Sequence, residues 1–242
     1  MASRVTALAL LSSAGWALPA NSRPIRGPNC FLKGTCILTA EGEAAIEDLR
    51  VGTLVVTMSG ELQPIKWLGR NTYRKSGPRW SERVIPIRIS CFAIDGITPN
   101  TDLYLSPNHA LYLDGSLIPV KQLENGISIL PVMPQGSETV EYFQIVLETH
   151  EVVWAAGVPA ETFAASNRAA FELFDNFYEY EQLYPADSFA IGHIAPELHM
   201  GGRAHFSALV GLGLSMARTP RNPIEEIYRK IAARAVERDL AA

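Results

Sequence analysis

The sequence has few cysteines, no long apolar run and no strong excess of charge, and each shortage excludes a class of protein. Its three cysteines are too few for a disulfide scaffold, and none forms the Cys-x-x-Cys pair of a common zinc site. Cys36 and Cys91 fit the ordinary role of small buried apolar side chains. No run of about 18 apolar residues is present, so no transmembrane segment is expected. Lys and Arg number 21 against 25 Asp and Glu, without a long basic tract, so we expect no nucleic-acid partner.

The first 29 residues differ from the rest of the chain because they contain no acidic residue. Val5 to Leu18 is apolar and is followed by Pro19 and Ala20, a pattern similar to a weak secretory signal. The alternative is a loosely ordered leader before the domain. The compartment therefore stays open: the signal-like N-terminus suggests a secreted form, whereas the unpaired cysteines favour a cytoplasmic one.

Cys30 to about Thr162 has the pattern of an all-β protein, in which short β-rich segments recur between turn residues. Asp114-Gly115 predicts a tight hairpin, because these residue types tolerate the positive φ angles that such a turn requires. Ser59-Gly60 is a second hairpin signal, and Asn71 to Glu82 is expected to form a surface loop. The expected strands are 35–39, 53–58, 61–68, 84–90, 110–113, 116–120, 127–132, 142–147 and 152–155.

After Thr162 the periodicity changes from that of strands to that of helices. Asn167 to Leu183 carries aromatic residues at helical spacing and predicts one helix packed on the β body. A later helix is expected after Asn222, which can cap it, with Pro223 at the first helical position. Its apolar stripe consists of Ile224, Ile227, Tyr228, Ile231 and Ala235. The expected organisation is a leader (1–29), an all-β domain (30–165) and a mainly helical C-terminal extension (166–242).

Cys30, His109 and His150 are the candidate reactive residues. A thiol is a nucleophile, but only a few per cent of a free thiol is ionised at neutral pH, so a base or a positive field must help. An imidazole titrates near neutral pH and can carry that proton. The structural alternatives stay open, since a histidine at a turn or strand edge can serve the fold alone. Three evenly spaced histidines suit no standard metal site: His193, His199 and His205.

Three stretches, in this order, resemble the Hint domains of the bacterial Hedgehog/intein-like type. The first begins Cys30-Phe-Leu-Lys-Gly-Thr35 and continues to Gln63-Pro-Ile-Lys-Trp-Leu-Gly-Arg70. The second, Leu105-Ser-Pro-Asn-His-Ala-Leu111, is similar to the family's Thr-x-x-His motif with serine in place of threonine. The third, from Tyr142 to Gly157, is similar to the closing strands of the fold.

The resemblance implies the horseshoe-shaped all-β Hint fold and an N-to-S acyl shift. The thiolate of Cys30 would attack the carbonyl of Asn29 and turn the peptide bond between them into a thioester. The chain's own N-terminal segment would be the acyl donor, and water or a small nucleophile would be the acceptor. Such a reaction is a single-turnover autoproteolysis, and no cofactor or metal is expected.

The resemblance also assigns roles around the thiol. His109 would transfer a proton to the departing amine of Cys30. Ser106 would hold the scissile bond by hydrogen bonding, and Thr35 would help to stabilise the oxyanion. His150 would be a second proton carrier or an orienting group.

The sequence departs from splicing inteins after Gly157. Val158 to Thr162 lacks the terminal His-Asn pair and the following nucleophile, so cleavage without full splicing is expected. Thr53 also stands where relatives commonly carry aspartate. Two alternatives stay open: a catalytically silent Hint-fold module for binding or secretion, and an ordinary cysteine hydrolase with a Cys30–His109 dyad.

Overall fold

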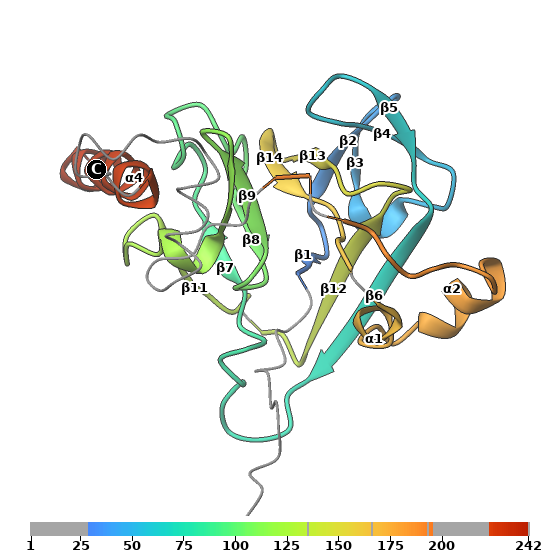
Figure 1. Cartoon of the computed structure of the whole chain (residues 1–242). Coiled ribbons are helices and arrows are strands. Elements are labelled where there is room, and N and C mark those ends of the chain that lie inside the picture. The colour runs from blue at the N-terminus through green and yellow to red at the C-terminus, as the bar shows by residue number, and fades with distance from the viewer. Residues whose placement is uncertain (1–28, 135, 166, 193, 196–222, 242) are drawn as a thin grey trace, which may run out of the picture.

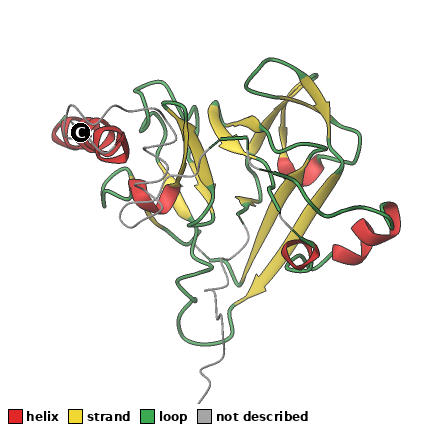
Figure 2. Ribbon diagram, in the orientation of Figure 1, coloured by secondary structure: helices red, strands yellow, loops and turns green. Residues whose placement is uncertain are grey.

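Two antiparallel sheets account for most of the described chain, which a computed structural model gives for residues 29–134, 136–165, 167–192, 194–195 and 223–241 (Figures 1 and 2). The six-stranded sheet has the order β11-β7-β8-β1-β12-β6. Its strands are β1 (Phe31–Leu32), β6 (Trp67–Arg74), β7 (Ile87–Ile89), β8 (Leu103–Leu105), β11 (Ile129–Pro131) and β12 (Thr139–Val146).

The eight-stranded sheet has the order β10-β9-β14-β13-β2-β4-β5, and β3 pairs with β2 beside this path. Its strands are β2 (Cys36–Thr39), β3 (Gly42–Ala45), β4 (Leu54–Val56), β5 (Leu62–Pro64), β9 (Ala110–Leu113), β10 (Ser116–Pro119), β13 (Val152–Ala155) and β14 (Val158–Glu161).

Both sheets curl, so each contributes strands to the two halves of a horseshoe outline. Figure 1 shows β7, β8, β9 and β11 in one half and β2 to β6 in the other, with β1, β13 and β14 between them. The main apolar core joins the two sheets and is closed by side chains such as Phe31, Ile37, Leu105, Ile145 and Val153, all buried. The fold is therefore all-β, as the sequence predicts, and its centre is the short strand β1.

The hairpin signals of the sequence are confirmed. Asp114 and Gly115 both have positive φ angles, 46° and 84°, and connect β9 to β10. Gly60 has a φ of 86° between β4 and β5. Paired positive φ angles give a turn the twist that matches two adjoining strands. The Asp114-Gly115 turn therefore favours the pairing of β9 with β10.

The expected surface loop begins later than the sequence indicates. β6 runs to Arg74, and Asn71 is 3% exposed because it pairs with Tyr142 on β12. The expectation that the loop starts at Asn71 is therefore wrong by four residues. Residues 71–74 have the polar pattern of a loop because their strand lies at a sheet edge, where one side faces other parts of the chain or solvent.

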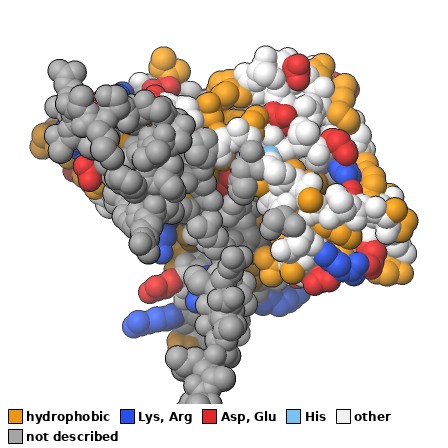
Figure 3. All heavy atoms as spheres, in the orientation of Figure 1, with side chains coloured by type: hydrophobic (Ala, Val, Ile, Leu, Met, Phe, Trp, Pro, Cys, Tyr) orange, Lys and Arg blue, Asp and Glu red, His pale blue; other side chains and the backbone are white. Residues whose placement is uncertain are grey.

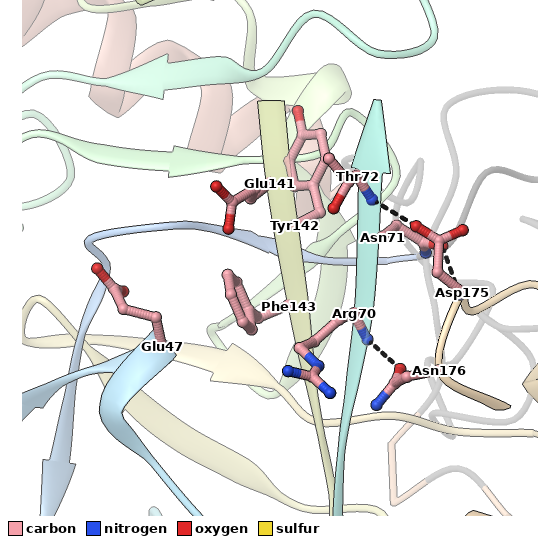
Figure 4. Close-up of a pocket in the computed structure, with 9 residues that line it drawn as sticks. All are labelled: Glu47, Arg70, Asn71, Thr72, Glu141, Tyr142, Phe143, Asp175 and Asn176. Atoms are coloured by element: carbon pink, nitrogen blue, oxygen red, sulfur yellow. Dashed lines mark hydrogen bonds between the residues drawn. The ribbon is translucent and has the colours of Figure 1, made fainter. Parts of the chain in front are cut away.

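The single helix expected over 167–183 is also wrong, because two short helices stand there: α1 (Arg168–Phe171) and α2 (Phe177–Leu183). Between them, the side chains of Asp175 and Asn176 accept hydrogen bonds from the N–H groups of Thr72 and Arg70, each at 2.7 Å (Figure 4). The Asn176 amide also donates to the Leu68 carbonyl at 3.0 Å. The helix is interrupted because this segment forms hydrogen bonds with the backbone groups on the outer edge of β6. No other strand among the described residues pairs with that edge.

An aromatic cluster joins α1 and α2 to the six-stranded sheet. The indole of Trp67 on β6 meets Phe174 edge-on at 5.5 Å between ring centroids, and Phe163 packs against Phe171 at 4.9 Å. Gly69 makes this approach possible, since a Cβ there would lie 2.7 Å from the Phe174 ring. Figure 3 shows charged groups of both signs over α1 and α2, where Arg168 pairs with two acidic side chains, Glu172 and Glu181.

The last helix, α4 (Pro223–Leu240), begins where the sequence predicts, although the expected cap Asn222 lies outside the described residues. Four residues of its expected apolar stripe are buried, Ile224, Ile227 and Ile231 in the main core and Ala235 beside them in sequence, whereas Tyr228 is half-buried. Two arginines also clamp α4 to the segment before β8: Arg234 donates to the Ile94 carbonyl, and Arg238 donates to the Cys91 carbonyl at 2.7 Å. Two short 3₁₀ helices, η1 (Ile46–Asp48) and η2 (Val120–Leu123), complete the described elements.

Candidate functional site

Strand β1 places Cys30 opposite Ser106. Phe31 pairs with Leu105 on one side and with Phe143 on the other, so the residue before β1 faces the residue after β8. The backbone N–H of Cys30 donates to the Ser106 Oγ at 2.9 Å, and the Ser106 N–H donates back to the Cys30 carbonyl at 2.9 Å. The serine hydroxyl therefore contacts the nitrogen of the Asn29–Cys30 peptide bond.

The Cys30 side chain is 1% exposed and lies in the aromatic cluster. Burial raises the pKa of its thiol far above the ordinary value, because the thiolate would lose its hydration. Burial also raises the pKa values of Tyr73 and Tyr142, that of Tyr73 to about 12. A charge on the nearby Cys30 would be a smaller cause in the same direction. The two tyrosine rings meet edge-on at 6.0 Å. In the resting site the sulfur is a neutral thiol among aromatic groups.

His109 follows a tight turn that places its ring against Phe31 of β1. Its N–H donates to the Ser106 carbonyl at 3.0 Å, and its ring centroid lies 4.3 Å from that of Phe31. The side chain is fully buried, and burial lowers the pKa of the imidazole to about 3. The backbone of Cys30 and of Glu161 favours the protonated ring, as carbonyl oxygens do, whereas His150 disfavours it.

Neither ring nitrogen of His109 has a hydrogen bond of good geometry within the described residues. A buried polar group without a partner costs free energy and is uncommon in native structures. The burial that lowers its pKa to about 3 keeps the ring neutral at neutral pH, next to the main chain of Cys30.

His150 lies in the turn before β13 and is 3% exposed. Its Nδ1 accepts a hydrogen bond from the Ile194 N–H at 3.0 Å, and its Nε2 lies 3.7 Å from Oε2 of Glu161. His150 thus approaches the site through the Glu161 carboxylate, and a positive charge on His150 would lower the pKa of His109.

Glu161 is the site residue that the sequence reasoning missed. It ends β14 and is 2% exposed, and its Oε1 accepts hydrogen bonds from the Asn29 Nδ2 at 2.7 Å and the Ala110 N–H at 2.8 Å. The carboxylate thus contacts the residue on the acyl side of the peptide bond. The sequence does carry a signal for it, because Glu161 is the single acidic residue in the mostly apolar run from Val152 to Phe163.

Two residues that the sequence singled out have their described contacts elsewhere. The Thr35 hydroxyl donates to the Leu32 carbonyl at 2.6 Å and closes the turn after β1. The Thr53 hydroxyl accepts from the Arg50 N–H at 3.1 Å in the turn before β4. The structure thus brings together Asn29, Cys30, Ser106, His109, His150 and Glu161.

Two surface cavities lie near this centre. The larger, about 420 Å³, borders the β6–β12 pair and the Asp175–Asn176 segment, and of its lining residues only Tyr142 belongs to the surroundings of the thiol (Figure 4). The second, about 370 Å³, is lined by His150, Thr149, Ile191 and Ile194 among others. His150 is thus the one predicted site residue that lines either cavity in the described part of the chain.

The described residues contain no cluster of three or more His, Cys, Asp or Glu side chains arranged to hold a metal ion. His193, His199 and His205 lie outside the described residues. Among the residues that the structure describes, no helix combines the length and apolar character needed to cross a membrane.

Comparison with known proteins gives one family and a set of solved structures. A model of the Hint domain family matches residues 29–167. The chain is similar in structure to the gp41-1 intein, with 13% identity, 55% of this chain and 97% of that one covered, and a TM-score of 0.39. A bacterial intein-like domain from Clostridium thermocellum has 16% identity and a TM-score of 0.39, with 55% of this chain and 98% of that one covered. A DnaB intein from Synechocystis sp. PCC 6803 has 9% identity and a TM-score of 0.38, with 56% of this chain and 99% of that one covered. No curated protein matches the chain in sequence.

Proposed function

The chain belongs to the Hint domain family, and from this premise we propose that it forms a thioester at Cys30 and cleaves the Asn29–Cys30 bond without full splicing. Family membership supports a self-processing domain in general. The observation that carries the finer proposal is the 2.9 Å hydrogen bond from the Cys30 N–H to Ser106, because it joins the serine to the nitrogen that must leave.

The reaction begins with attack of the Cys30 sulfur on the carbonyl carbon of Asn29. A carbon–sulfur bond forms, the carbon–nitrogen bond of the peptide breaks, and the sulfur's proton ends on the released amine. Water or a small thiol then attacks the thioester, which frees residues 1–29 and leaves Cys30 as a new N-terminus with its thiol restored. The cycle consumes its own substrate bond and runs once.

His109 is the proposed proton carrier between sulfur and nitrogen. Burial disfavours both the thiolate of Cys30 and the imidazolium of His109, so neither charge is stable before attack. The proton therefore moves as the carbon–sulfur bond forms, when the developing charges lie side by side and offset each other. This arrangement makes the resting site unreactive and the acyl shift slow.

Ser106 supports the departure of the amine. Its Oγ accepts a hydrogen bond from a neutral amide N–H in the resting chain. The same contact strengthens when that nitrogen becomes a charged amine, because a hydrogen bond from an ionised donor is roughly twice as strong as one from a neutral donor. An interaction that grows along the reaction lowers the barrier, whereas one of constant strength does not.

The acceptor is proposed to arrive through the cavity that His150 lines. That cavity of about 370 Å³ accommodates water or a small thiol. To accept a proton from a nucleophile there, His150 would have to release the hydrogen bond that its Nδ1 accepts from the Ile194 N–H, because its other ring nitrogen faces Glu161.

The test is the intact mass of the purified protein with and without dithiothreitol, beside a Cys30→Ala variant and a Cys91→Ala control. We expect loss of residues 1–29 from the wild type and the control, faster with thiol, and none from the Cys30→Ala protein. Cleavage near Ala20 in all three proteins would instead identify a signal peptide. Whole chains under thiol would overturn the proposal.

The catalytically silent module is the second candidate, and the burial of the thiol favours it. A sulfur that is 1% exposed and held neutral has no route to chemistry unless the site rearranges or the proton moves with the attack. A chain that stays intact under thiol would support that reading, whereas slow alkylation of the buried Cys30 is expected in either case.

A further inference from the structure

A buried carboxylate holds the side chain of the residue that donates the acyl group. Glu161 is 2% exposed, and its Oε1 accepts a 2.7 Å hydrogen bond from the Asn29 Nδ2. The same oxygen accepts the Ala110 N–H at 2.8 Å, which ties the carboxylate to the start of β9. The contact spans 132 residues of sequence, so only the folded domain creates it.

This contact constrains which residue can stand before Cys30. Taking a carboxylate out of water is costly unless hydrogen-bond donors or positive charge replace the water. The Asn29 amide supplies one of the donors, and His150 approaches the other oxygen at 3.7 Å. A side chain without a donor at position 29 would remove one of these contacts, and an acidic side chain would place a second negative charge against the first.

The contact also orients the reacting carbonyl. The Asn29 side chain and its carbonyl carbon are both attached to the same Cα, so fixing the amide limits rotation at that carbon. Attack requires the sulfur and the carbonyl to be held in one relative orientation, and holding reactants in place contributes a large part of many rate enhancements.

We propose that Glu161 is a specificity-determining residue that selects an acyl donor whose side chain donates a hydrogen bond, and that it disfavours an acidic residue at position 29. This inference rests on the proposed function, since the selection acts on the acyl shift at Cys30. The ligand of the Glu161 site is thus the chain's own scissile residue, of the carboxamide class.

The test compares rates of thiol-induced release of residues 1–29 in four proteins: wild type, Asn29→Asp, Glu161→Gln and the double variant. The aspartate is nearly isosteric with Asn29, so it changes charge and donor capacity while keeping size. With Glu161 present we expect Asn29→Asp to slow release about 100-fold, because two carboxylates would share one buried site. With Glu161→Gln we expect the same substitution to slow release less than about tenfold, because the buried negative charge is gone.

Glu151→Gln is the matched control, because Glu151 lies ten residues before Glu161 and is bound by the hydroxyl of Thr149 rather than by Asn29. It should leave the effect of Asn29→Asp unchanged. A purely structural role for Glu161 would slow release from the Asn29 and Asn29→Asp proteins by the same factor. Equal effects of Asn29→Asp in the presence and absence of Glu161 would therefore overturn the inference while the proposed function stands. No release from the wild type would overturn both.

Discussion

The burial of His109 makes a measurable prediction about stability in acid. The pKa of the imidazole is lowered from 6.5 to about 3 in the folded protein, whereas the unfolded chain keeps the ordinary value. Above pH 6.5 the ring is neutral in both states, so the stability that its neutral form supplies is fully present. As the pH falls from 6.5 toward 3, the unfolded state binds a proton that the folded state does not, and stability is lost.

The size of this loss follows from the two pKa values. At about pH 4.5 the unfolded ring is nearly all protonated and the folded ring is nearly all neutral, which costs about 2.7 kcal/mol at 1.36 kcal/mol for each pKa unit. At about pH 7.5 the same difference is about 0.1 kcal/mol. His109 alone should therefore remove about 2.6 kcal/mol of stability between the two conditions, a large share of the total for a domain of this size.

The assay is equilibrium urea unfolding at both pH values of a Cys30→Ala protein, which cannot process itself, with and without His109→Gln. Glutamine is polar and does not titrate, so the His109→Gln protein should lose about 2.6 kcal/mol less on acidification than its parent. All carboxylates and the other histidines titrate in both proteins and cancel in the comparison. Equal losses in the two proteins would refute the reasoning, because His109 would then have the same pKa folded and unfolded.

Three further predictions follow from single contacts. Ser106→Ala should slow thiol-induced release by about 10- to 100-fold, since the Cys30 N–H loses its acceptor, while Ser106→Thr should stay within about tenfold of wild type; equal rates for all three proteins by intact mass would contradict the role. Iodoacetamide should label the half-buried Cys91 well before the buried Cys30, whose pKa is raised, as peptide mass spectrometry would show; equal labelling rates would contradict that burial. Gly69→Ala should lower the free energy of unfolding by about 1–3 kcal/mol, because the new Cβ would meet the Phe174 ring; an unchanged urea midpoint would argue against this close packing.

The sequence predicts those parts of the fold that depend on local pattern. The β9–β10 hairpin follows from Asp114-Gly115, and α4 follows from Pro223 and its apolar stripe, because each is determined by residues close together in the chain. Of the strands it did not predict, β3 and β14 pair with the strand just before them in the chain, whereas β1 pairs only with distant segments. β1 has two residues and is a strand only because β8 and β12 lie on either side of it.

The candidate site likewise contains residues that the sequence identifies and one that only the fold reveals. Motif spacing singles out Cys30, Ser106 and His109, since their residue types suggest chemistry wherever they lie. Glu161 could not be assigned from pattern, because a lone acid at a strand end is usually solvated and its partner Asn29 is distant in sequence. The break between α1 and α2 was not predictable for a related reason, because the hydrogen bonds that cause it are made with β6, about 100 residues earlier in the chain.

The segment that covers the edge of β6 has a practical meaning for anyone dividing this protein. The family match ends at residue 167, yet the backbone of β6 is completed by residues 175 and 176. A fragment cut at the family boundary would keep every candidate catalytic residue while leaving the outer edge of the eight-residue strand β6 without its hydrogen-bond partners. Such an edge invites pairing with a second copy. The part that holds the candidate catalytic residues is thus smaller than the part that covers this edge. Because α4 is buried against the main core, a shortened protein should keep α4 as well as α2.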